Sequence, residues 1–106
     1  MSAQYMHIGV PIEEVRPGMH YNEWGGFWVS DSVEGHDFRI EYLKFEENTR
    51  FPKPVTEKWH VAYRVDEPEP YLHEADEVLF DESPDGKERI VFILKNGALI
   101  ELYHNE

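Results

Sequence analysis

Five short stretches of this 106-residue chain alternate apolar and polar residues with a period of two, and a sixth is an apolar run of strand length. They are QYMHIGV (4–10), GFWVSD (26–31), FRIEYLKF (38–45), KWHVAYRV (58–65), RIVFILK (89–95) and, as the sixth, ALIELYH (98–104). A period of two is typical of β-strands, whose successive side chains point to opposite faces. Only Asn96-Gly97 separates the last two stretches, which indicates a tight hairpin. The chain is therefore predicted to consist mainly of strands.

Signals for helices are few. In DEPEPYLHEADEVLF (66–80), prolines occupy the opening turn, and Leu72, Ala75 and Leu79 then recur at helical spacing. The corresponding stretch PIEEVRPG (11–18) predicts at most a turn or two of helix before Pro17-Gly18. Two prolines in EENTRFPKPVTE (46–57) predict a linker without regular structure.

Composition narrows the class of protein. A content of 41% hydrophobic and 14% aromatic residues is typical of a globular domain. The absence of cysteine excludes disulfides, thiolate metal sites and cysteine nucleophiles. The net charge of −12 argues against nucleic acid as a partner. No signal peptide or membrane-length apolar stretch is recognisable, so we expect a cytoplasmic protein without membrane contact.

The two halves of the chain share an order of features. His7 in MHIGV and His60 in WHVAY each lie between an apolar residue and a β-branched residue followed by a small one. Further along, Glu41 in RIEYL and Glu101 in LIELY each follow an isoleucine. This order predicts an internal repeat, with one module at about residues 4–47, a linker at about 48–57 and a second module at about 58–105.

Strand alternation places the four matched residues on one face of each strand. On the strand of His60, the core face is predicted to hold Trp59, Val61, Tyr63 and Val65. His7, Glu41 and Glu101 likewise lie opposite the larger β-branched and aromatic residues of their strands. If the modules pack with pseudo-twofold symmetry, two imidazoles and two carboxylates converge. This set suits Zn, Ni, Co, Fe or Mn and leaves two positions open on an octahedral ion. A substrate with neighbouring oxygens would fit there.

The alternatives for these residues are structural. A histidine within a strand is often a packed side chain, and a glutamate can lie at an exposed sheet edge. Arg64 and Arg39 lie on the predicted cavity side and are candidates for binding a substrate carboxylate. The alternative is that each forms an ion pair on the surface. Trp28 is a candidate for an aromatic wall, and the alternatives are ordinary core or dimer packing.

The motif His-[IV]-[GA] on a first strand and Ile-Glu-[LY] on a last strand, found twice, resembles the vicinal oxygen chelate superfamily of glyoxalases, bleomycin-resistance proteins and extradiol dioxygenases. The second half, WHVAYRVDE through VLFDESPDGKERIVFILKNGALIELYH, is the more similar; residues 11–38 are shorter than in typical members. The resemblance implies an α+β fold of two tandem βαβββ modules, forming a curved mixed sheet around a central cavity.

The resemblance also implies roles. His7, Glu41, His60 and Glu101 match the metal ligands of glyoxalase I-like members, and Glu101 or Glu41 would be the catalytic base. The expected protein is a metal-dependent lyase or isomerase acting on a small molecule, and a homodimer. The alternatives are a non-catalytic small-molecule-binding protein of the same fold, like the bleomycin-resistance members, and a dimeric interaction module.

Overall fold

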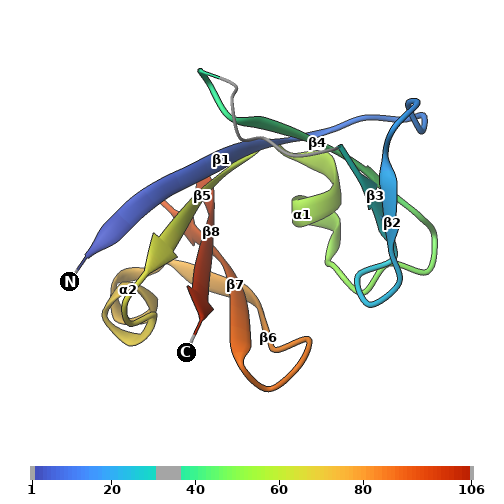
Figure 1. Cartoon of the computed structure of the whole chain (residues 1–106). Coiled ribbons are helices and arrows are strands. Elements are labelled where there is room, and N and C mark those ends of the chain that lie inside the picture. Colours follow the sequence, from blue (N-terminus) through green and yellow to red (C-terminus); the bar gives the residue numbers. More distant parts are fainter. Residues whose placement is uncertain (1, 31–36, 106) are drawn as a thin grey trace. The chain divides into compact units, whose positions relative to one another are not determined.

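The computed structural model describes residues 2–30 and 37–105, which form eight strands and two short helices. The strands are β1 (Ala3–Pro11), β2 (His20–Asn22), β3 (Phe27–Val29), β4 (Ile40–Phe45), β5 (His60–Val65), β6 (Glu77–Glu82), β7 (Glu88–Lys95) and β8 (Ala98–Asn105). The helices are α1 (Lys53–Glu57) and α2 (Glu69–Glu74) (Figure 1). The strands form a mixed sheet in the order β2-β3-β4-β1-β5-β8-β7-β6, which agrees with the α+β prediction.

The chain divides into two compact units. The N-terminal unit comprises His7–Trp59, and the C-terminal unit comprises His60–Glu106 together with Met1–Met6. Strand β1 therefore has residues in both units. The predicted curvature of the sheet around a central cavity stays a prediction.

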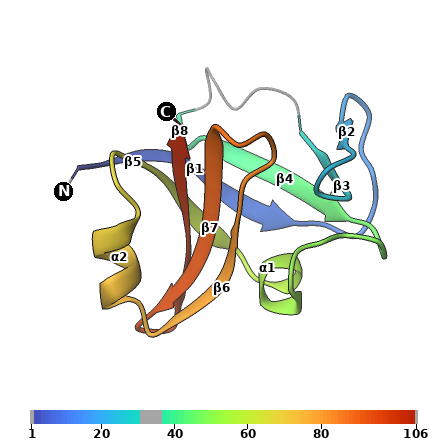
Figure 2. The ribbon, with the colours of Figure 1, turned by 90° about the horizontal axis from the view of Figure 1, so that it is seen from below.

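In the C-terminal unit, β5 pairs with β8 in parallel. The pairs β8–β7 and β7–β6 are antiparallel. The β7–β8 connection is the predicted hairpin. Asn96 (φ 52°) and Gly97 (φ 81°) both have positive φ, as a two-residue type I′ turn requires. Helix α2 lies along one face of these strands (Figure 2). Its Tyr71 and Leu72 pack on a buried cluster formed by Val65, Val91, Ile93 and Leu102.

In the N-terminal unit, β1 pairs with β4 in parallel. The pairs β4–β3 and β3–β2 are antiparallel. This strand order equals that of the C-terminal unit. Residues 12–19 contain no helix, so the predicted βαβββ pattern is met only in the second half; Pro17-Gly18 ends any helical turn there. The core of this unit consists of Leu43, Val55 and the mutually packed rings of Phe27, Phe45 and Phe51.

Two further expectations were wrong. The segment predicted to lack regular structure contains α1, because Pro52 is its N-cap residue and Pro54 lies in the first turn, where proline needs no amide hydrogen. Trp59, predicted to be core, is 66% exposed, and it lies outside β5, which begins at His60. Among the described residues, no helix is long and apolar enough to cross a membrane.

Candidate metal centre

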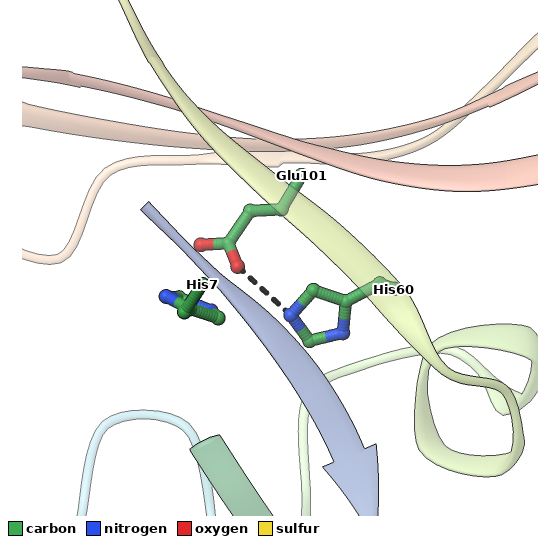
Figure 3. A group of neighbouring side chains, drawn as sticks. All are labelled: His7, His60 and Glu101. Carbon is green, nitrogen blue, oxygen red and sulfur yellow. Dashed lines mark ion pairs between the residues drawn. The ribbon is translucent and has the colours of Figure 1, made fainter. Parts of the chain in front are cut away.

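A histidine and a glutamate form a close pair in the C-terminal unit. His60 is the first residue of β5, and Glu101 lies on the neighbouring strand β8, directly opposite Ala62. Because His60 precedes Ala62 by two residues, its side chain leaves the sheet on the same face as that of Glu101. Figure 3 shows the ion pair between His60 and Glu101. The His60 Nε2 atom lies 3.1 Å from Glu101 Oε1, and the two side chains are 2% and 14% exposed.

The N-terminal unit contains a pair with the same construction. His7 lies on β1, and Glu41 lies on the neighbouring strand β4, directly opposite Gly9. His7 precedes Gly9 by two residues, as His60 precedes Ala62. The His7 Nε2 atom lies 3.4 Å from Glu41 Oε1. The two pairs therefore share strand pairing, register and contacting atoms, within two units of equal strand order.

The residue opposite each glutamate is small. Gly9 faces Glu41, and Ala62, which is 0% exposed, faces Glu101. Side chains directly opposite each other on neighbouring strands have Cβ atoms only about 5 Å apart. A larger residue at either position would compete for the space through which the glutamate reaches its histidine.

Phe92 borders the C-terminal pair on the other side and was missed from the sequence. It lies on β7 directly opposite Glu101, and its ring meets the His60 ring edge to face, with centroids 5.1 Å apart. Phe80 packs in turn on Phe92. A signal was present, because the two-residue Asn96-Gly97 turn pairs Lys95 with Ala98 and so, three residues along each strand, Phe92 with Glu101.

The donor atoms suit a divalent transition metal. Each pair offers an imidazole nitrogen and a carboxylate oxygen, and both are ligand types that Zn²⁺ and similar ions accept. Bonds of about 2.1 Å from imidazole or carboxylate to such an ion separate neighbouring ligand atoms by about 3.0 Å in octahedral and 3.4 Å in tetrahedral geometry. The separations in the two His–Glu pairs, 3.1 and 3.4 Å, are compatible with these values and equally with a hydrogen bond or an ion pair.

Of the predicted substrate-binding residues, Arg64 shares the face of His60 and Ala62. Its side chain is exposed, and its guanidinium carbon lies 5.1 Å from the centre of the Tyr103 ring. Burial and a hydrogen bond that the hydroxyl donates to Glu88 raise the pKa of Tyr103 to about 12. Tyr103 is therefore uncharged at neutral pH, and its ring can make a cation–π contact with the Arg64 guanidinium group.

Trp28 and Arg39 have other surroundings. Trp28 lies opposite Lys44, so alternation along β4 places it on the face away from Glu41. Its indole nitrogen donates to Glu46 at 3.1 Å. Arg39 precedes β4 and has a positive φ of 54°, so strand alternation does not extend to it. Its carbonyl accepts a hydrogen bond from the Ile8 amide.

Along β8, Glu101 lies on the face opposite Ile100 and Leu102, as predicted, but the faces of the candidate ligands are not free of large apolar side chains. Glu41 shares its face of β4 with Leu43 and Phe45, and Glu101 shares its face with Phe92. Apolar residues lie on both faces of the four strands in each unit. Alternation therefore separates the two faces but does not show which of them packs against the core.

Comparisons with known proteins gave no relative: no family model, no curated protein and no solved structure matches the chain. The mixed eight-stranded sheet and the two His–Glu pairs are compatible with a glyoxalase-like fold. Membership of that superfamily stays a prediction.

Proposed function

We propose that this protein is a metal-dependent lyase or isomerase of glyoxalase or epimerase type, built from two tandem modules of common origin. Its substrate is a small 2-oxo or 2-hydroxy compound with two neighbouring oxygen atoms. The observation that carries the proposal is the equal construction of the two His–Glu pairs. In each, histidine and glutamate lie on neighbouring parallel strands, with a small residue opposite the glutamate.

Under this proposal His7, Glu41, His60 and Glu101 are the protein ligands of one Zn, Ni, Mn, Co or Fe ion. The close approach of histidine and glutamate within each of the two pairs supports it. When bound, the metal acts as a Lewis acid on the substrate's oxygen atoms.

The glutamates have a second task in the proposed reaction. A carboxylate oxygen of Glu101 or Glu41 removes the proton from the carbon next to the substrate carbonyl. For isomerisation, the same carboxylic acid returns the proton to the neighbouring carbon, and the hydroxyl proton of the substrate moves to the former carbonyl oxygen. For epimerisation, the other glutamate in its protonated form donates a proton to the opposite face of the same carbon, and the first glutamate keeps the proton that it removed. Both sequences balance without an oxidant or reductant. Arg64 is the proposed contact for a substrate carboxylate, and a homodimer is the proposed assembly.

Proton exchange tests this function even when the product has not been identified. The protein, loaded with Zn²⁺, Ni²⁺ or Mn²⁺, is incubated in D₂O with 2-oxoaldehydes and epimerisable 2-hydroxy and 2-oxo acids, and loss of the C–H signal is followed by proton NMR. We expect exchange in the native protein, a loss of at least about 100-fold in Glu101→Gln, and no change in Glu77→Gln, an exposed residue of β6. Binding of these compounds without exchange, in every metal form, would instead support the non-catalytic binding protein.

A further inference from the structure

A pocket of about 210 Å³ lies within the C-terminal unit, on the side of the sheet away from His60 and Glu101. Tyr71 of α2 and Tyr63 of β5 contribute to it, as do strands β1, β7 and β8. Its lining residues are Ala3, Tyr63, Tyr71, Glu74, Ile93, Lys95, Ile100 and Leu102. Alternation along β8 separates Ile100 and Leu102 from Glu101, so this pocket is distinct from the candidate metal centre.

The wall of the pocket is apolar. Ile93 and Leu102 are buried, Ile100 is half-buried, and two tyrosine rings complete the surface. A buried water needs two to four polar partners, and an aliphatic and aromatic wall offers few of them. Displacing poorly held water by an apolar group is favourable.

The charged residues of the lining come from the last turn of α2 and the end of β7. The Lys95 ammonium group donates a hydrogen bond of 2.6 Å to the carbonyl oxygen of Glu74, the last residue of α2. Lys95 is the last residue of β7, so its side chain links that strand to the helix. The carboxylate of Glu74 and the chain's net charge of −12 disfavour an anionic ligand.

We propose that this pocket binds a neutral, apolar small molecule that carries a single substituted ring or a branched chain of similar size. An apolar cavity of about 150 Å³ in another protein holds benzene, so the pocket here has room for a ring with one or two substituents. The ligand's apolar body contacts Ile93, Ile100 and Leu102, and Tyr63 and Tyr71 meet its ring edge or face. This inference does not depend on the proposed metal centre.

Toluene and indole are the test ligands, titrated into the native protein while the methyl groups are followed by ¹H–¹³C NMR. We expect saturable shifts confined to the methyl groups of Ile93, Ile100 and Leu102, with a Kd of about 1 mM or tighter. Ile100→Phe fills the pocket and should weaken binding at least about tenfold. Ile90→Phe is the same substitution on β7, on the face away from the pocket, and it should leave the affinity for the test ligands unaltered.

Two results would overturn the proposal. The first is no saturable shift of the three pocket methyl groups in the native protein, a measurement that needs no variant. The second is a change of the same methyl signals with protein concentration in the absence of ligand, because the pocket would then be covered by a second copy of the chain.

Discussion

Ala62 lies directly opposite Glu101 on neighbouring parallel strands, with no exposed surface of its own. Gly9 and Glu41 stand in the same relation in the other unit. In both units the small residue leaves the glutamate free to approach the histidine two residues earlier. The register of these strands, and not the histidines alone, therefore defines the candidate site.

Enlarging Ala62 should weaken metal binding. In Ala62→Val the added methyl groups compete with the Glu101 side chain, and disturbing the groups that orient a metal ligand typically lowers metal affinity by about 10- to 100-fold. Titration with Zn²⁺ in competition with a chromophoric chelator measures the effect. Ala98→Val, the same change at an exposed position of β8, should bind like the native protein. Equal affinities in the two variants would contradict a role for the register.

Phe92 should orient His60 as well as fill the core. Phe92→Leu keeps an apolar side chain but removes the ring edge against the imidazole, so metal affinity should fall about tenfold. The free energy of unfolding without metal should fall by about 1–2 kcal/mol. Phe80→Leu keeps the contact between Phe92 and His60. It should lower the free energy of unfolding by a similar amount and leave the metal affinity unchanged. Parallel losses of affinity in both variants would show that Phe92 acts only through packing.

Gly26 is expected to be essential to the fold of the N-terminal unit. It has φ +70°, and an added Cβ would lie 2.8 Å from the Thr49 Cα, which is backbone and cannot turn aside. Gly18 has a similar φ of +86° but open space around it. Gly18→Ala should therefore cost about 1–2 kcal/mol from backbone conformation alone. Gly26→Ala should cost about 1–3 kcal/mol more because the neighbouring backbone must shift. Urea denaturation of both variants measures the difference, and equal midpoints would contradict it.

Tyr103 should make stability sensitive to alkaline pH. Burial and the Glu88 carboxylate raise the pKa of Tyr103 from 10.0 to about 12 in the folded protein. Below pH 10 the phenol is protonated in folded and unfolded chains alike, so its contribution is fully present. As pH rises from 10 to 12 the unfolded chain ionises first, and the contribution is lost.

The phenolate absorbance, compared between the native protein and Tyr103→Phe, isolates this titration. The difference should show a midpoint of about 12, and Glu88→Gln should lower that midpoint by removing a negative charge. A midpoint near 10 in the folded protein would show that burial and Glu88 do not act on Tyr103.

The sequence allowed most strands and the pairing of each histidine with its glutamate to be predicted. Period-two alternation located the strands around His7 and His60, and Asn96-Gly97 located the hairpin that carries Glu101. These signals are local, because each depends on neighbouring residues and their backbone preferences.

Features decided by packing were harder to predict. Helix α1 begins in a segment with two prolines, and prolines usually interrupt helices, so the segment was predicted to be a linker. Its Val55 is buried through tertiary contacts, which the local sequence does not reveal. Trp59 lies one residue outside β5, where alternation no longer applies. The position of Trp28 away from Glu41 depends on how β3 pairs with β4, and nothing in either strand alone fixes that register.

The metal content of the purified, untagged protein tests the central claim most directly. Elemental mass spectrometry after loading with Zn²⁺, Ni²⁺ or Mn²⁺ and extensive dialysis should find close to one ion per chain in the native protein and in Glu77→Gln. Glu101→Gln should lose most of it, because a neutral amide replaces a charged ligand. No retained metal in the native protein after loading with any of these ions would contradict the claim, and the two His–Glu pairs would then be ion pairs or hydrogen bonds of the folded core.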